Sequence, residues 1–374
     1  MKKVLHLTTH LNSGGITIYI LRLVDFLRSA GFETLIFSAG GEYASFFQGK
    51  NVKLLTCDIQ TKSEIHPKLM PALRRLMRVI REEKIDILHA HTRITQVLAY
   101  WAGKFTGVPV VTTCHGFYKT RLGRRLLPAW GQRAIAISEP VGKHLANDFH
   151  VPEERIRVVN NAVDIKLLDE QYRRHSSEQV RKDFGFEKED RVIGIVARLV
   201  NDKGHEYLLR AAAELCRDFP DIRVLIVGDG RERPILEDLA KALGIRERVV
   251  FTGNITDVSM ALAAMDIFAF PATWREGFGL SIVEAMTCAK PVIVTNIWAL
   301  NSLIQNEVTG FLVEPKSVPA LVDAIRKLLE DPALRRRIGE SAREAVERLF
   351  TIERMAAEIS CVYKETLTPA LKSL

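Results

Sequence analysis

The chain has 374 residues, of which 47% are hydrophobic and 26% are charged. A single hydrophobic core serves about 150 residues, so this length predicts two domains and excludes a small disulfide-stapled module. The composition excludes a disordered or low-complexity protein. No apolar stretch approaches the ~18 residues that cross a bilayer, and the N-terminal run is not the apolar core of a signal peptide. We therefore expect a globular, cytoplasmic protein.

The basic residues are unevenly distributed. Residues 1–160 contain 23 Lys and Arg against 12 Asp and Glu, whereas residues 161–374 contain 30 against 33. The first half is thus the basic half. The five cysteines are odd in number and far apart, and they form no Cys-x-x-Cys pair, so we expect reduced, buried thiols.

Runs of apolar and β-branched residues alternate with segments of helical period along the whole chain. Apolar residues at a spacing of three to four predict helices at 16–30, 69–83, 203–219 and 318–330. Strands are expected at 4–8, 33–37, 85–89, 110–113, 134–137, 156–159, 191–197, 223–227, 249–252, 267–270, 291–295 and 311–313. Continuous apolar strands between helices indicate parallel sheets covered on both faces.

The fold class that follows is α/β, with two doubly wound parallel sheets. We place the first domain at 1–165 and the second at 166–350. The polar stretch 166–190 is interpreted as a linker with a connecting helix. Ligands of open parallel sheets bind beyond the carboxyl ends of the strands, so the expected site is a cleft between the two sheets, built from loops that follow strands.

The first strand is followed by Asn12-Ser13-Gly14-Gly15 and then by a helix. Adjacent glycines at a helix start let backbone N–H groups approach an anion, which outlines a phosphate site. Ordinary turn chemistry is the alternative. The segment is neither Gly-x-Gly-x-x-Gly nor a P-loop, which disfavours both of those nucleotide sites.

Histidines follow two strands of the first half. His115 comes directly after a strand and before Gly116, where it can hydrogen-bond a ligand, although a histidine satisfied by backbone groups is the alternative. His89 and His91 share a strand face, which invites a metal interpretation. No further ligand stands at a supporting spacing, so we expect no metal site.

In the second half, Arg198 and Lys203 precede a helix start. Positive charge opposes the helix dipole there, and an anion between the two cations would resolve that conflict. Charge-assisted hydrogen bonds to a diphosphate, at about 1.5–3 kcal/mol each, outweigh the few tenths lost to the dipole. A surface ion pair with Asp202 is the alternative.

The most specific segment runs from Trp274 to Met286 and holds Glu276 and Glu284 eight residues apart around Gly277-Phe278-Gly279. Glu276 is expected in a loop and Glu284 in an otherwise apolar helix. A carboxylate in apolar surroundings needs donors, and sugar hydroxyls are suitable donors. A Glu solvated on an exposed helix face is the alternative.

Taken together, Gly14-Gly15, His115, Arg198 with Lys203, and Glu276 with Glu284 resemble the motifs of the family 4 retaining glycosyltransferases. The likeness runs from Gly14 to about Val313. It implies the GT-B fold, in which two facing Rossmann-like domains enclose an interdomain cleft. It also implies that the terminal segment 351–374 forms a helix that returns to the first domain.

The resemblance assigns roles by position. Arg198 and Lys203 would hold the donor diphosphate, helped by backbone groups of Gly14 and Gly15 and of the turn Gly277, Phe278, Gly279 and Leu280. Glu284 would bind the ribose, Glu276 a hydroxyl of the donor sugar, and His115 the sugar beside the bond that breaks. Gly228, Gly253 and Asn254 would lie near the ribose and base.

Two segments depart from the family pattern. Asn296–Asn301 replaces a common Gly-Gly-x-Pro-Glu run, so donor-sugar contacts from that loop do not carry over. Asn161-Ala162-Val163-Asp164 replaces a common Asn-Gly-Val-Asp near the domain junction.

The function that we expect is sugar transfer from a nucleoside-diphosphate sugar, UDP-linked before GDP-linked, to a cell-surface glycan, a lipopolysaccharide or a lipid-linked acceptor. The phosphate charge would be stabilised by cations and N–H groups, without a metal or other cofactor. A nucleotide-sugar epimerase and a non-catalytic membrane-associated scaffold are the alternatives.

The basic half suggests where the acceptor is met. Arg74, Arg75, Arg78 and Arg81 fall on one predicted helix, and a second basic segment, residues 119–130, contains apolar residues and Trp130. Such a face suits an anionic membrane, here the inner face of the cytoplasmic membrane. A plain solvated face is the alternative. Nucleic acid is not expected, because no recognised binding motif accompanies the charge.

Overall fold

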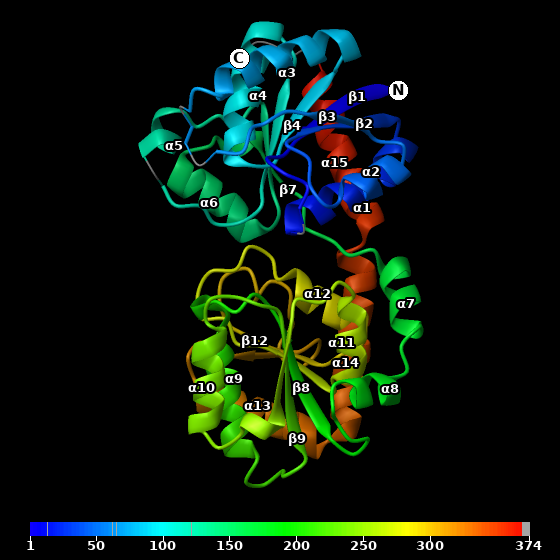
Figure 1. Cartoon of the computed structure of the whole chain (residues 1–374), viewed down its shortest axis with the longest axis vertical. Coiled ribbons are helices and arrows are strands. Elements are labelled where there is room, and N and C mark those ends of the chain that lie inside the picture. Colours follow the sequence, from blue (N-terminus) through cyan, green and yellow to red (C-terminus); the bar gives the residue numbers. More distant parts are fainter. Residues whose placement is uncertain (13, 62, 65, 121, 369–374) are drawn as a thin grey trace. The chain divides into compact units, whose positions relative to one another are not determined.

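The computed structural model describes residues 1–12, 14–61, 63–64, 66–120 and 122–368 (Figure 1). Ser13 of the glycine turn and Arg121 of the basic segment therefore lie outside the described residues. The chain divides into two compact units. Unit 1 comprises Met1–Asn161 and the C-terminal segment that begins at Ile352, and unit 2 comprises Ala162–Thr351.

Unit 1 is built on a parallel sheet in which the described strands follow the order β3-β2-β1-β4-β5-β6-β7. These strands are β1 (Lys2–Leu7), β2 (Phe32–Ser38), β3 (Lys53–Thr56), β4 (Ile87–Ala90), β5 (Val110–Cys114), β6 (Arg133–Ala136) and β7 (Ile156–Val158). The helices of the unit are α1 (Gly15–Ser29), α2 (Ala44–Gly49), α3 (Leu69–Glu83), α4 (Arg93–Thr106), α5 (Leu122–Leu126), α6 (Glu139–Phe149) and α15 (Ile352–Leu367).

The two faces of this sheet differ in polarity because successive side chains of a strand alternate between faces. Leu5 and Leu7 of β1 join Leu88 of β4 in an apolar core under α3 and α4. The residues between them, His6 and His89, point to the opposite face, where α1 and α15 pack together. Figure 1 shows α15, in red, beside α1. The C-terminal helix therefore completes the first unit and covers its histidine-bearing face.

Unit 2 has a second parallel sheet, with its described strands in the order β10-β9-β8-β11-β12-β13. These strands are β8 (Arg191–Val196), β9 (Ile222–Val227), β10 (Val249–Gly253), β11 (Ile267–Phe270), β12 (Val292–Thr295) and β13 (Phe311–Val313). Its helices are α7 (Ile165–Arg173), α8 (Ser177–Asp183), α9 (His205–Leu215), α10 (Arg233–Ala242), α11 (Val258–Ala264), α12 (Leu280–Thr287), α13 (Val318–Glu330) and α14 (Pro332–Leu349).

Helices cover both faces of the second sheet. Helix α9 packs against α10 and α13, whereas α11 packs against α7 and α8, and α12 against α14. In Figure 1 these two groups flank the sheet on opposite sides. The predicted fold class, α/β with two doubly wound parallel sheets, is thus confirmed.

The chain order reverses once in each sheet, between β1 and β4 in unit 1 and between β8 and β11 in unit 2. At such a switch point the connecting helices leave toward opposite faces, which opens a crevice at the carboxyl ends of the two central strands. The segments that follow β1, β8 and β11 begin at these crevices. They carry Gly14-Gly15, Arg198 with Lys203, and Glu276.

The structure differs from the sequence-based elements in two places. The edge strand β3 was not predicted, because it has only four residues and is not fully buried on either face. The interpretation of 166–190 as a linker is wrong. That stretch holds most of α7 and all of α8, both of which pack on α11 within unit 2.

Three smaller expectations can also be compared with the structure. All five cysteines are free, but only Cys114 and Cys288 are buried, so the expectation of buried thiols fails at the half-buried Cys57 and Cys216 and at the exposed Cys361. No described helix is both long and apolar enough to span a membrane. In the basic segment that follows His115, Trp130 is buried and the Arg124 guanidinium lies 4.2 Å from the centroid of the Tyr118 ring. These two residues therefore add little to an exposed basic face.

Candidate active site

The loop that follows β8 is held against the loop that follows β11. Arg198 is exposed at its start, and a 3₁₀ turn (Asn201–Lys203) leads to Gly204, which caps α9. A Cβ at Gly204 would lie 1.8 Å from the carbonyl oxygen of Pro271, and the residue has φ +72°, so only glycine fits. The Thr273 N–H donates to the Asp202 carbonyl at 2.9 Å. This packing sets the position of Lys203.

Lys203 forms an ion pair with Glu276. Both side chains are mostly buried, at 12% and 19% exposure, and the second carboxylate oxygen, Oε1, accepts the N–H of Gly277 at 3.1 Å. The Lys203 ammonium also lies 5.6 Å from the centroid of the Phe270 ring. The partner of Lys203 is therefore Glu276 rather than Asp202. Two of the predicted catalytic residues meet at the switch point of the second sheet.

The turn after Glu276 starts α12. Gly279 adopts φ +86°, and a Cβ there would lie 2.8 Å from Ile282 Cδ1. Phe278 is buried against the Phe350 ring, so only its backbone can face a ligand. No side chain caps this helix, and its first turn contains no acidic residue. Its N–H groups and positive dipole end are thus open to an anion near Leu280.

Glu284 lies one turn into α12, where its side chain is half-buried between the buried residues Val283 and Ala285. It is therefore not the fully solvated residue of the alternative interpretation. Arg198 and Asn254 have exposed side chains. Whether these three residues bind a donor remains a prediction from the resemblance.

The glycines at the ends of β9 and β10 have a clear packing function. The Gly228 N–H donates to the Gly253 carbonyl at 2.9 Å. A Cβ on Gly228 would lie 2.1 Å from the Ala197 carbonyl oxygen, and both glycines have positive φ. Close backbone approach explains glycine at position 228 and the positive φ explains it at position 253, both without a ligand, so the donor-binding role of these glycines stays a prediction.

The loop that departs from the family pattern carries one aromatic side chain, Trp298, which lies against the loop that follows β11. The Arg275 guanidinium lies 5.8 Å from the centroid of the Trp298 ring, and Trp274 is 66% exposed. Ala299 has φ +80°, a conformation that costs about 1–2 kcal/mol outside glycine. The sequence alone did not indicate that the loops after β11 and β12 meet through these side chains.

In unit 1, Gly14 and Gly15 begin α1. Among the described residues, a Cβ at either position would meet no atom within 4 Å, and α1 has neither a side-chain cap nor an acidic residue in its first turn. The open space and uncapped N–H groups suit the predicted anion site. Helix α1 also brings Tyr19 against His115, with an edge-on ring contact of 4.9 Å between centroids.

His115, itself half-buried, is the outer end of a cluster with the buried residues His6, His89 and His91. His115 Nε2 lies 3.1 Å from His91 Nδ1, and His91 Nε2 lies 2.9 Å from His6 Nδ1. Burial lowers the pKa of His6 and of His115 to about 3, and that of His89 and His91 well below the usual value. All four imidazoles are therefore neutral at physiological pH. Sequence analysis does not select His6, whose proximity depends on the adjacency of β1 and β4.

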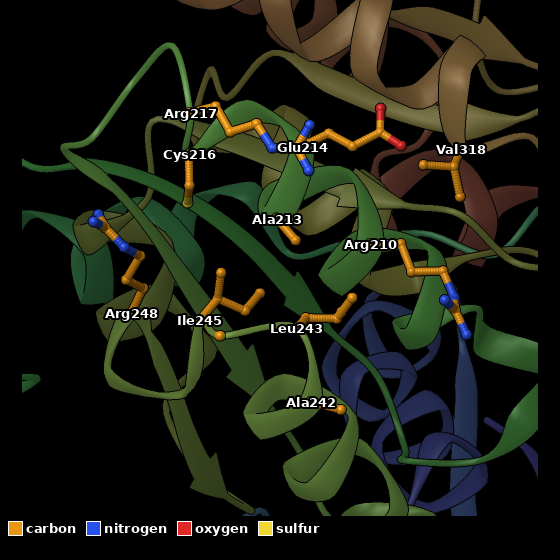
Figure 2. Close-up of a pocket in the computed structure, with 11 residues that line it drawn as sticks. Arg210, Ala213, Glu214, Cys216, Arg217, Ala242, Leu243, Ile245, Arg248 and Val318 are labelled. Atoms are coloured by element: carbon orange, nitrogen blue, oxygen red, sulfur yellow. The ribbon is translucent and has the colours of Figure 1, made fainter.

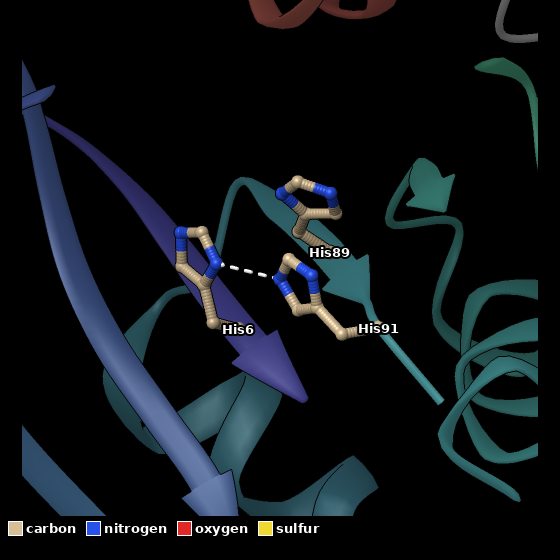
Figure 3. A group of neighbouring side chains, drawn as sticks. All are labelled: His6, His89 and His91. Carbon is tan, nitrogen blue, oxygen red and sulfur yellow. Dashed lines mark hydrogen bonds between the residues drawn. The ribbon is translucent and has the colours of Figure 1, made fainter. Parts of the chain in front are cut away.

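Figure 3 shows His6, His89 and His91 converging from β1 and β4. One nitrogen of each ring lies within 4.8 Å of the others, a spacing that could suit a metal ion. In the structure these nitrogens form hydrogen bonds instead, because each ring is bonded to another histidine, a tyrosine or a threonine. A metal would have to replace these hydrogen bonds.

Unit 2 also contains a cavity of about 630 Å³ along α9. Its lining includes Arg210, Arg217 and Arg248, together with Glu214. In Figure 2 the side chains of Arg248 and Arg210 extend away from each other at opposite ends of the cavity. The cations therefore do not converge on one point, and none of the predicted site residues lines this cavity.

Two parallel-sheet units of this topology are found in solved glycosyltransferases of the GT-B fold. Family models agree with this class. The Glycosyltransferase Family 4 model matches residues 13–167, and the Glycosyl transferases group 1 model matches residues 176–345. The chain belongs to the family 4 glycosyltransferases and is a transferase.

Individual relatives are similar over most of their length. The chain is 30% identical over 303 residues to the N-acetyl-alpha-D-glucosaminyl L-malate synthase of Bacillus anthracis, covering 78% of each chain. It is 28% identical to the UDP-Gal:alpha-D-GlcNAc-diphosphoundecaprenol alpha-1,3-galactosyltransferase of Escherichia coli, covering 79% of each. The crystal structure of Anabaena HepE in complex with UDP and glucose has a TM-score of 0.84 and 22% identity, covering 98% of this chain and 100% of the other.

Proposed function

We propose that this protein is a retaining glycosyltransferase that moves a sugar from a nucleoside-diphosphate sugar to a hydroxyl acceptor. The observation that carries the proposal is the Lys203–Glu276 ion pair at the switch point of the second sheet, beside the uncapped start of α12. A cation and open helix amides suit a diphosphate, and a carboxylate suits the hydroxyls of the attached sugar.

The charges match the chemistry of the transfer. Breaking the bond between the anomeric carbon and the diphosphate places negative charge on the leaving phosphate. Lys203, Arg198 and the N–H groups of α12 would stabilise that charge, a type of interaction worth about 2.7–4 kcal/mol per preorganised donor. Because these groups suffice for the leaving group, we propose that no metal ion or other cofactor is required.

Retention of configuration requires either two displacements or attack from the face that the phosphate leaves. Glu276 is engaged by Lys203 and by the Gly277 N–H, and a carboxylate so engaged is a weak nucleophile. We therefore favour same-face attack, with the acceptor hydroxyl giving its proton to the departing phosphate oxygen. Trapping of a sugar covalently bound to Glu276 would overturn this mechanism.

A uridine diphosphate donor is favoured, with guanosine diphosphate next. The similarity to Anabaena HepE, described in complex with UDP and glucose, and to a galactosyltransferase named for UDP-Gal supports this order. The latter enzyme is also named for a diphosphoundecaprenol acceptor, which supports a lipid-linked or cell-surface glycan acceptor for this chain.

A membrane surface is the proposed location of that acceptor. Arg74, Arg75, Arg78 and Arg81 are exposed on α3, whose opposite side is buried in unit 1. Each basic residue near an anionic bilayer contributes about 1 kcal/mol. We propose peripheral attachment through this α3 face, at the inner surface of the cytoplasmic membrane.

Thermal denaturation with UDP, GDP and ADP tests the nucleotide site. A ligand at 100 times its dissociation constant adds about 2.7 kcal/mol to the free energy of unfolding, so UDP should raise the melting temperature of unit 2. Lys203→Ala should abolish most of that rise, whereas Lys241→Ala, at an exposed lysine on α10, should retain it. An unchanged response of Lys203→Ala would remove the proposed role of Lys203.

Product analysis distinguishes the alternatives. A transferase releases nucleoside diphosphate only as the acceptor is consumed, whereas an epimerase acts on its nucleotide sugar without an acceptor. The comparisons with known proteins give the epimerase no support. A non-catalytic scaffold would bind vesicles but consume no donor.

A further inference from the structure

A continuous chain of hydrogen bonds crosses the core of unit 1 and ends at His115. From His115 Nε2 it passes to His91 Nδ1 at 3.1 Å, and from His91 Nε2 to His6 Nδ1 at 2.9 Å. His6 Nε2 lies 3.5 Å from the Tyr363 hydroxyl, which lies 2.6 Å from His89 Nδ1. His89 Nε2 lies 2.7 Å from Thr113 Oγ1. The two nitrogens of His6, His89 and His91 are all used.

The topology explains why these residues meet. His6 and His89 are register partners on β1 and β4, so they share one face of the sheet. His91 follows His89 by two residues and returns to the same face. Tyr363 reaches this face from α15. Figure 3 shows the hydrogen bond between His6 and His91 as a dashed line.

Burying these polar side chains costs stability. The side chains of His6, His89, His91 and Tyr363 have no exposed surface. A polar group in such a site costs stability unless it is hydrogen-bonded, so each member depends on the others. Burial also keeps the four imidazoles neutral, because it lowers their pKa values far below 7.

Neutral imidazoles restrict the arrangement of protons. A neutral ring donates from one nitrogen and accepts at the other. If His6 donates from Nδ1 to His91 Nε2, then His91 must donate from Nδ1 to His115 Nε2, and His115 carries its proton on Nδ1. Tyr363 then donates to His6 and accepts from His89 Nδ1, while Thr113 donates to His89 Nε2.

Reversing every hydrogen bond gives the second arrangement, in which each of the four rings is protonated on Nε2. Both arrangements contain the same number of protons and no charge. Any mixture of the two tautomers either leaves a hydrogen bond without a proton or with two protons, or makes the Tyr363 oxygen accept from both His6 and His89, so that its own buried O–H donates to neither ring. The four rings are therefore locked to one another.

We propose that His6, His91, His89, Tyr363 and Thr113 are positioning residues that impose one common tautomer on themselves and on His115. The tautomer decides whether His115 Nδ1 donates or accepts a hydrogen bond. The consequence for a sugar hydroxyl at His115 rests on the proposed function, whereas the locking itself does not.

Nitrogen-15 NMR of the full chain, labelled at histidine, tests the proposal directly. The chemical shifts of Nδ1 and Nε2 identify the protonated nitrogen of each ring, and single substitutions of each histidine by Gln assign the signals. We expect His6, His89, His91 and His115 to be neutral and to share one tautomer at pH 7.5. Different tautomers among these four rings would overturn the proposal.

Tyr363→Phe removes the hydroxyl that joins His6 to His89 but keeps the ring. His115 is separated from Tyr363 by His6 and His91 along the chain of hydrogen bonds. We nevertheless expect the Nδ1 and Nε2 signals of His115 to shift or to split between tautomers. The matched control is Phe32→Leu, which alters the ring packed 5.2 Å from Tyr363 and leaves every hydrogen bond in place. That control should lower the melting temperature without changing the tautomers. Unchanged His115 signals in Tyr363→Phe would contradict the proposal, and Thr113→Val provides a second variant if Tyr363→Phe does not fold.

Kinetics connect the chain of hydrogen bonds to transfer. Loss of one buried hydrogen bond corresponds to about a tenfold change in a rate, so kcat of Tyr363→Phe should fall by about that factor with little change in donor KM. The two proposals fail separately. If the NMR signals show a shared tautomer that Tyr363→Phe disrupts, but the chain transfers no sugar, only the proposed function is rejected. Normal transfer with mixed tautomers would reject only the locking.

Discussion

Lys203 and Glu276 follow different strands of the second sheet, yet their side chains form a mostly buried ion pair. The pair exists because β8 and β11 are neighbours and because Gly204 lets the two loops approach closely. Under the proposed function, a bound donor would divide this pair, with the ammonium turned toward the diphosphate and the carboxylate toward the sugar. Binding and transfer should therefore respond differently to changes in the two residues.

Glu276→Gln should separate these two steps. Glutamine keeps the size of the side chain but loses the charge that binds Lys203 and strengthens hydrogen bonds to hydroxyls. We expect kcat to fall by about 100-fold, equivalent to ~2.7 kcal/mol, while UDP still raises the melting temperature because Lys203 and α12 remain. Steady-state kinetics and thermal denaturation measure the two effects, with Glu340→Gln, at an exposed residue of α14, as the control. Equal loss of UDP binding in Glu276→Gln and Lys203→Ala would argue against separate roles.

Gly204→Ala should destabilise unit 2 strongly. The added Cβ would meet the Pro271 carbonyl at 1.8 Å in a backbone conformation of φ +72°. Gly185 has nearly the same φ, +75°, but a Cβ there would meet no atom within 4 Å. We expect Gly185→Ala to cost about 1–2 kcal/mol from backbone strain alone, and Gly204→Ala to cost more than ~3 kcal/mol because the loop must also move. Urea denaturation of the two variants compares the costs, and similar values would show that the Pro271 contact is unimportant.

Most strands and helices could be predicted because their signals are local. The runs at β8, β9 and β11 are continuously apolar, as expected for strands covered on both faces. β3 was missed because an edge strand of four residues, none of them fully buried, lacks that signal. The segment 166–190 was taken for a linker because its helices α7 and α8 bury few residues, Leu168 and Val180 among them.

The site was harder to predict because it depends on which strands are neighbours. The types of the residues at the strand ends indicated anion chemistry, but neither the Lys203–Glu276 pair nor the approach of His6 to His91 is visible in the sequence. Both follow from the reversal of strand order at β8–β11 and β1–β4. For the same reason the alternative interpretation named Asp202, a near neighbour in the sequence, whereas the partner of Lys203 is Glu276.

The α3 face should bind anionic vesicles. Arg74→Glu with Arg78→Glu reverses two exposed charges and leaves the buried side of α3 intact. At about 1 kcal/mol for each basic residue lost, binding to vesicles containing phosphatidylglycerol should weaken by at least ~30-fold. Sedimentation with vesicles at low and high salt measures the effect, with Arg336→Glu with Arg354→Glu as a control that reverses two other surface arginines. Equal binding of the two double variants would show that α3 is a solvated face.

The buried histidines should make unit 1 sensitive to acid. The pKa of His6 is about 3 in the folded chain and about 6.5 in the unfolded chain, so below pH 6.5 only the unfolded chain takes up this proton. The contribution of His6 to the free energy of unfolding is thus fully present above pH ~6.5. It is lost as the pH falls toward 3, at about 1.4 kcal/mol per pH unit. His89, His91 and His115, which form the same cluster, add to the slope in the same direction.

His6→Asn should therefore flatten the dependence of the unfolding free energy on pH between 6.5 and 5. The control is Phe32→Leu, which removes no titratable group and should shift the curve without changing its slope. Parallel curves for wild type and His6→Asn, measured by urea denaturation at each pH, would mean that His6 does not stay neutral in the folded chain.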